Sequence, residues 1–102
     1  MVVNLLDETR KTLSRNGRSP DEVLWIGTRD SESIDWLTFE ALANFEYDNG
    51  FGGAEINQKL VVVGRDWWLE RGEYDGSEWW EFKMLPVQPE STKKLSISSE
   101  EY

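Results

Sequence analysis

The feature that most constrains the fold is a single Asp75-Gly76 step between two tryptophan-rich runs of alternating residues. Asp-Gly favours a type I′ turn, because both central residues of that turn need φ > 0. We therefore predict a β-hairpin that pairs Tyr74 with Ser77 and Trp67 with Met84. Alternation then defines a core face and an outward face. The core face carries Trp67, Leu69, Trp80, Phe82 and Met84, and the outward face carries Trp68, Glu70, Tyr74, Trp79, Glu81 and Lys83.

A third strand is predicted immediately before the hairpin, over residues 56–63. Gly64-Arg65 can form a two-residue turn with glycine first, which pairs Val62 with Trp67 and Lys59 with Glu70. Both faces then stay consistent across three strands, and a slip by one residue would scramble them. The C-terminal half is therefore predicted to be a three-stranded meander.

Two helices and one more strand are predicted before this meander. The first helix covers residues 2–15, ends at Asn16-Gly17, and places Val2, Leu5, Leu6, Thr9 and Leu13 near one face. Residues 19–22 predict one helical turn, followed by a strand over 23–28, although a continuous short helix is an alternative. The second helix begins after Ser33 as N-cap, ends near Tyr47, and has an apolar stripe of Ile34, Leu37, Ala41, Leu42 and Phe45.

The predicted fold class is α+β, with both helices packed on one face of a small antiparallel sheet. A length of 102 residues predicts one domain, residues 1–87. Residues 88–102 are rich in serine and proline and predict a loose C-terminal tail, although Leu95 and Ile97 alternate as in a docked edge strand. The first residues lack a signal-peptide pattern and nothing approaches a membrane span, so we expect a cytoplasmic protein.

The glycine-rich segment 48–53 admits a phosphate cradle, a calcium loop or a plain connection. A phosphate loop needs its glycines between a strand and a helix, whereas these follow a helix. Asp48, Asn49 and Glu55 do not have the spacing of calcium ligands. We therefore predict a mobile connection, with Phe51 packed against the core.

The residue types argue against catalysis. The chain has no cysteine and no histidine, which excludes disulfides, thiolate zinc sites and the commonest general base. Glu70 and Glu81, directly opposed in the hairpin, would have a spacing compatible with a retaining glycosidase. So small a domain leaves little material for a sugar-binding cleft, however. We expect no enzyme activity, no cofactor and no metal.

Acidic residues dominate the charge. The formal net charge is −9, and residues 30–55 contain no lysine or arginine. The acids in this segment are Asp30, Glu32, Asp35, Glu40, Glu46, Asp48 and Glu55. Such a field repels nucleic acid and attracts basic surfaces, although solubility alone is an alternative explanation.

The segments DNGFGGAEI and WWLERGEYDGSEWWEFKMLP resemble small accessory proteins encoded by phages and prophages of Gram-positive bacteria. The resemblance covers roughly residues 25–86. It implies an accessory protein of a mobile element and supplies no catalytic residues.

These observations predict a non-catalytic acidic protein-binding module. Its expected form is a phage-encoded inhibitor, of the anti-CRISPR or anti-restriction type, that occupies the basic nucleic-acid-binding surface of a host enzyme. The expected partner-binding residues are Asp30, Glu32, Asp35, Glu40, Glu46, Asp48, Trp68, Glu70, Tyr74, Trp79 and Glu81. The alternative is a phage structural or assembly protein that forms a homodimer through the aromatic sheet face.

Overall fold

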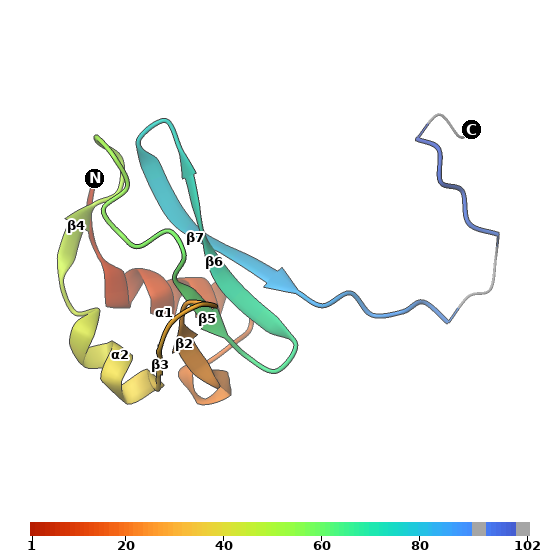
Figure 1. The fold of residues 1–102 in the computed structure, drawn as a ribbon, viewed down its shortest axis with the longest axis horizontal. Coiled ribbons are helices and arrows are strands. Elements are labelled where there is room, and N and C mark those ends of the chain that lie inside the picture. The colour runs from red at the N-terminus through yellow and green to blue at the C-terminus, as the bar shows by residue number, and fades with distance from the viewer. Residues whose placement is uncertain (91–93, 100–102) are drawn as a thin grey trace.

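The computed structural model describes residues 1–90 and 94–99, which form an α+β fold around a five-stranded antiparallel sheet (Figure 1). The strands of this sheet are β2 (Trp25–Gly27), β3 (Ser33–Ile34), β5 (Val61–Val63), β6 (Trp67–Tyr74) and β7 (Ser77–Met84), in the order β3-β2-β5-β6-β7. A second, two-stranded sheet pairs β1 (Val2–Asn4) with β4 (Glu46–Asp48). The helices are α1 (Leu5–Arg15), α2 (Trp36–Leu42) and a 3-10 turn, η1 (Pro20–Glu22). The predicted fold class and C-terminal meander are confirmed.

The β6–β7 hairpin has the predicted register along its whole length, from Tyr74 opposite Ser77 to Trp67 opposite Met84. Asp75 and Gly76 have φ angles of 52° and 87°, as a type I′ turn requires. Asp75 is the only described residue other than glycine with positive φ. The Asp-Gly step therefore determines the register of the longest pairing in the molecule.

The β5–β6 register differs from the prediction by two residues. Val62 lies opposite Leu69, and the N–H of Gly64 donates to the carbonyl of Trp67 at 2.8 Å, so Arg65-Asp66 forms the turn. Gly64 is needed for another reason: a Cβ there would lie 2.1 Å from the Trp67 ring. A shift by two residues leaves every side chain on its predicted face. The predicted start of this strand at residue 56 is also wrong, because β5 begins at Val61.

Helix α1 begins at Leu5 and not at Val2 as predicted. The side chain of Asn4 caps the helix by accepting from the N–H of Asp7 at 3.0 Å. Residues 2–4 instead pair with β4. The N–H of Leu5, which has no partner within the helix, donates to the carbonyl of Phe45 at 3.0 Å. This long-range pairing overrides the local helical pattern. The predicted end is correct, because Gly17 follows the helix with a φ of 69°.

Helix α2 is shorter than predicted and uses a different face. Its N-cap is Asp35, since Ser33 lies in β3, and the helix ends at Leu42. The predicted stripe is wrong: Leu37 is 74% exposed, whereas Phe39 is buried. A helix that begins at Trp36 and runs for two turns reaches the core through positions 36, 39 and 43, and the chain then continues as β4.

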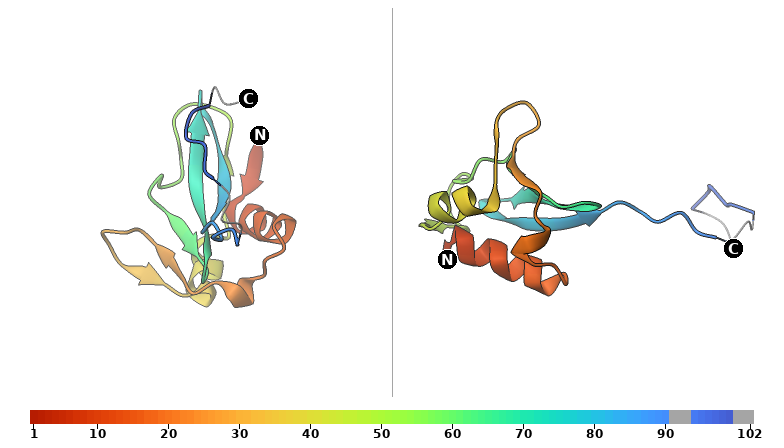
Figure 2. Two further views of the ribbon diagram at one scale, coloured as in Figure 1. Left: turned by 90° about the vertical axis from the view of Figure 1, so that its right-hand side faces the viewer. Right: turned by 90° about the horizontal axis from the view of Figure 1, so that it is seen from below.

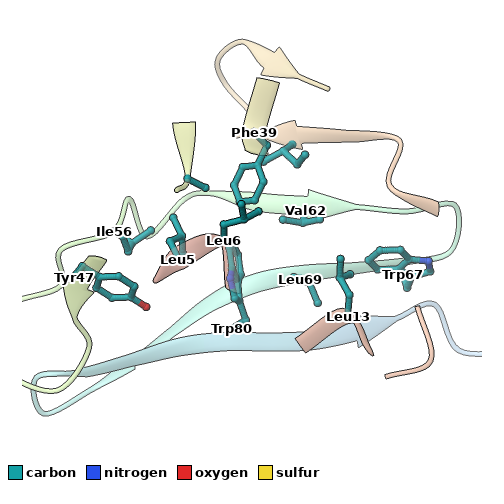
Figure 3. Close-up of a cluster of buried hydrophobic side chains, with 12 residues drawn as sticks. Leu5, Leu6, Leu13, Phe39, Tyr47, Ile56, Val62, Trp67, Leu69 and Trp80 are labelled. Carbon is teal, nitrogen blue, oxygen red and sulfur yellow. The ribbon is translucent and has the colours of Figure 1, made fainter. Parts of the chain in front are cut away.

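Both helices contribute to one core on one face of the sheet. Figure 2 shows α1 along one side of the β6–β7 hairpin, with the β2–β3 turn projecting on the other side. Figure 3 shows Leu13 from α1 and Phe39 from α2 in the same cluster as Leu69 and Trp67. The helical turn predicted over residues 19–22 is present as η1, and the strand predicted over residues 23–28 is present as the shorter β2.

The packing of Phe51 on the core is wrongly predicted, and the alternative of a docked edge strand after residue 88 is not found among the described residues. Phe51 is 80% exposed and does not pack on the core. Beyond β7 the chain leaves the body of the fold (Figure 1), and residues 85–90 and 94–99 contain no helix or strand. Leu95 and Ile97 are exposed and pair with no strand. The remainder of the predicted tail, 91–93 and 100–102, lies outside the described residues.

Candidate functional site

The outward face of the five-stranded sheet carries an open groove of about 540 Å³. Strand pairing places Trp25 of β2, Val63 of β5 and Trp68 of β6 in one row across this face. The next row contains Gly27, Val61 and Glu70. The groove is lined by Trp25, Arg29, Asp30, Gln58, Lys59, Val61, Val63, Trp68 and Glu70, and by Arg71, whose side chain is fully buried. We name the apolar members of these rows, Trp25, Val61, Val63 and Trp68, the aromatic groove.

A charge-assisted hydrogen bond fixes the central tryptophan of the groove. The indole Nε1–H of Trp68 donates to Oε1 of Glu70 at 2.7 Å. Such a bond holds the ring in one orientation, and it also occupies one carboxylate oxygen of Glu70. Trp68, Trp25 and both valines are half-buried, so the groove offers preformed apolar surface to a ligand.

A second tryptophan extends the outward face toward β7. Gly72 lies opposite Trp79, and a Cβ at Gly72 would stand 2.6 Å from the indole nitrogen of Trp79 and 2.7 Å from Oε1 of Glu81. The missing side chain at Gly72 therefore lets the Trp79 ring lie across β6. Trp79 remains 38% exposed.

The charges around the aromatic groove are of both signs. Arg29 and Lys59 line the groove together with Asp30 and Glu70, and Lys83 continues the row of Trp68. The groove itself is therefore not an acidic surface. The excess negative charge of the chain lies outside it.

The structure brings together only part of the predicted binding set. Trp68, Glu70, Trp79 and Glu81 share the outward face, as predicted. Asp30 lines the groove, and Glu32 lies in the same β2–β3 turn. Tyr74 is exposed at the tip of the hairpin, and Glu46 is exposed on β4.

Three predicted acids have local partners elsewhere. Asp35 caps α2, and hydrogen bonds from the side chain and the backbone N–H of Thr38 lower the pKa of Asp35. Glu40 pairs with Arg10 of α1. The N–H of Gly50 and the N-terminal ammonium both bond Asp48 and lower its pKa. These carboxylates support the fold and do not belong to the aromatic groove.

A buried polar network that the sequence did not predict lies on the core face of the sheet. Nη2 of Arg71 donates to Oε1 of Glu78 at 3.0 Å and to the hydroxyl of Tyr47 at 2.9 Å. The Tyr47 hydroxyl donates to Glu8 at 2.5 Å. Arg71 also lies over the Trp80 ring, 4.6 Å from its centroid. The missed signal was alternation, which places Arg71 and Glu78 on the core face beside Leu69 and Trp80.

The network joins loop 55–58 to the hairpin. Glu78 accepts from the N–H of Glu55 at 2.6 Å and from the N–H of Ile56 at 3.2 Å. Burial and the hydrogen bond to Glu8 raise the pKa of Tyr47 above its usual range, so Tyr47 stays protonated as a donor. The network thus connects α1, β4 and loop 55–58 to the core face of the hairpin.

The structure shows neither a metal cluster nor a membrane span in the part of the chain that it describes. Across residues 1–90 and 94–99, no three Asp or Glu side chains are grouped to hold a metal ion. Within the same ranges, no helix has the length and apolar character needed to cross a membrane.

Comparisons with other proteins give no family assignment. No protein-family model, curated protein or solved structure matches this chain.

Proposed function

We propose that the chain is a non-catalytic protein-binding module that docks the outward face of its sheet on a basic partner. In its concrete form it is a phage-encoded inhibitor, of the anti-CRISPR or anti-restriction type. Such an inhibitor would occupy the nucleic-acid-binding surface of a host enzyme.

The observation that carries this proposal is the aromatic groove. Trp25 and Trp68 are half-buried and lie in one row on the face of the sheet that carries the groove. Tryptophan is enriched among the residues that dominate binding energy, and these residues sit where neighbours exclude water. The bond from Trp68 to Glu70 orders one ring before binding, which lowers the entropy lost on association.

The charge of the chain favours a basic partner. The net charge of −9 produces a field that attracts a positive surface and accelerates encounter. The same field opposes direct binding of single-stranded nucleic acid, which combines aromatic stacking with a cationic groove. Arg29 and Lys59 within the groove can pair with carboxylates in the partner's contact surface.

A capture experiment tests this proposal. Immobilised wild-type protein is exposed to a bacterial lysate at low and moderate salt, and captured proteins are identified. The expected capture is a nucleic-acid-binding enzyme that added duplex DNA displaces and that Trp68→Ala weakens. Leu37→Ala is the matched control, because Leu37 is exposed on α2 and lies outside the groove. Recovery of no such enzyme, or capture that is insensitive to both DNA and Trp68→Ala, contradicts the proposal.

A second candidate is a phage assembly protein that forms a homodimer through the same face. The mixed charges around the groove favour it, because Lys59 and Arg29 of one copy can face Glu70 and Asp30 of another. In that case Trp68→Ala would abolish the dimer measured by sedimentation velocity.

A further inference from the structure

Within residues 1–90 and 94–99, strand β7 is an edge of the five-stranded sheet, and most of its free side has no partner. Because Tyr74 and Ser77 close a two-residue turn, the backbone groups of even-numbered residues in β7 point away from β6. The N–H of Glu78 fits this pattern, since it donates outward to the carbonyl of Asn49 at 2.8 Å. Among the described residues, nothing bonds the N–H groups of Trp80, Phe82 and Met84.

An edge of this length is a template for another strand. Natural proteins protect such edges with short strands, bulges, covering loops or prolines. Here the eight-residue strand has regular pairing with β6 throughout, and the covering loop reaches only Glu78. The exposed residues along the remainder include Met84 and Leu85.

We propose that a second copy of the chain pairs with this edge, β7 against β7, antiparallel about a two-fold axis at Phe82. Phe82 then faces Phe82 of the second copy, and Trp80 faces Met84. The backbone N–H and C=O groups of Trp80, Phe82 and Met84 all point away from β6. Each opposed pair can therefore exchange two hydrogen bonds. The pairing continues the sheet from one copy into the other.

The charges of β7 select this register. With Phe82 on the axis, Glu81 of each copy lies opposite Lys83 of the other, on the outward face. A shift of two residues in one direction places Glu81 opposite Glu81, and the opposite shift places Lys83 opposite Lys83. Directly opposed like charges destabilise a strand pair. A shift of one residue would place each even-numbered residue opposite an odd-numbered one, whose backbone groups are already bonded to β6.

The ends of the pairing also fit. In this register Leu85 faces Trp79, and Pro86 faces Glu78. Pro86 has no N–H, and the N–H of Glu78 is already donated to Asn49. The ladder therefore stops at both ends where backbone donors are lacking.

Dimerisation through the β7 edge is a property that the proposed function does not include. A two-fold axis normal to the sheet places the outward faces of both copies on the same side. Met84, 47% exposed in the single chain, becomes covered next to Trp80 of the second copy. Two aromatic grooves would then be presented together, and binding of a partner with two sites would gain from the linkage.

Charge reversal tests the register. We expect the wild type to sediment as a dimer. Glu81→Lys and Lys83→Glu should each raise the dimer dissociation constant by roughly tenfold or more, because each variant places two pairs of like charges opposite one another in the dimer. Mixing the two single variants should give a heterodimer, because one copy then carries two lysines at these positions and the other carries two glutamates. The double variant, Glu81→Lys with Lys83→Glu, should also recover the dimer.

The controls keep the test decisive. Glu73→Lys makes the same charge change at an exposed site of the hairpin outside the ladder, and should leave the dimer intact. Circular dichroism checks that each variant is folded. A wild type that stays monomeric at high concentration, or singles that do not recover on mixing, overturns the proposal. Dimer loss in Trp68→Ala without any effect of charge reversal also overturns it. These outcomes are separate from the capture of a basic partner, which uses the groove and not the edge.

Discussion

Arg71 and Glu78 form an ion pair across the β6–β7 hairpin, with Nη2 and Oε1 3.0 Å apart and both side chains shielded from solvent. Removing one member of a buried pair leaves an uncompensated charge in a medium of low polarity. The pair lies on the core face of the hairpin whose outward face carries Trp68 and Trp79, so we expect its loss to destabilise that hairpin.

Glu78→Gln is expected to destabilise the fold by about 3–5 kcal/mol. The amide group would present a donor to the N–H of Glu55 or Ile56 and would remove the charge that neutralises Arg71. Urea denaturation measures the free energy of unfolding. Glu81→Gln, on the same strand but the outward face, should change it by less than about 0.5 kcal/mol. Equal losses in the two variants would contradict the buried role of Glu78.

The tryptophans of the hairpin are expected to divide by face. Trp67 and Trp80 are buried, so replacing either by alanine should cost about 3–5 kcal/mol of stability through the cavity it leaves. Trp80→Ala also removes the indole donor to Thr9 Oγ1, a bond of 2.9 Å. Trp68→Ala and Trp79→Ala should cost clearly less, because these rings are partly in water. Thermal melting of the four variants shows whether the division holds. Similar melting temperatures for all of them would mean that the outward face is covered.

Gly64→Ala should destabilise the protein by about 1–3 kcal/mol through overpacking. The added Cβ would lie within 2.1 Å of the Trp67 ring, which the core holds in place. Gly53→Ala is the matched control, since a Cβ there meets nothing within 4 Å and its φ is not positive. Chemical denaturation of both variants measures the difference, and a tolerated Gly64→Ala would show that Trp67 can move.

Tyr47 should make stability fall at alkaline pH. Its pKa is raised in the folded state, chiefly by burial and then by the hydrogen bond to Glu8, so the protonated form favours folding. This contribution is complete below the unfolded pKa of about 10 and is lost as pH rises above it. Tyr47→Phe should be less stable at neutral pH but should lose less stability between about pH 9 and 11. Parallel pH profiles of wild type and variant, obtained by denaturant titration, would refute the assignment.

Sequence patterns predicted best where local chemistry decides the structure. The Asp75-Gly76 turn determined the register of the β6–β7 hairpin, and alternation then predicted the correct face for Trp67 and Trp68. Gly64 misled the turn prediction, because its lack of a side chain serves the contact with Trp67 and not the turn. Pairing between β1 and β4 was hidden, since residues 2–4 and 46–48 are far apart in the chain and each continued a helical pattern.

The site was predicted in part for the same reason. Trp68, Glu70, Trp79 and Glu81 follow from hairpin alternation, whereas Trp25 reaches the groove only through the pairing of β2 with β5. That pairing joins segments separated by the whole of α2 and the glycine-rich loop. The acids between residues 30 and 55 were grouped by sequence, but the fold distributes them over the β2–β3 turn, α2 with its N-cap, β4 and the loop between β4 and β5.

Calorimetric affinity between a purified captured partner and a panel of alanine variants tests the role of the outward face most directly. Trp68→Ala and Trp25→Ala should each weaken binding by on the order of 2 kcal/mol, or about thirtyfold. Phe51→Ala, which changes an equally apolar and more exposed ring outside the groove, should leave the affinity unchanged. Wild-type affinity in both tryptophan variants, or an equal loss in Phe51→Ala, would contradict binding through the aromatic groove.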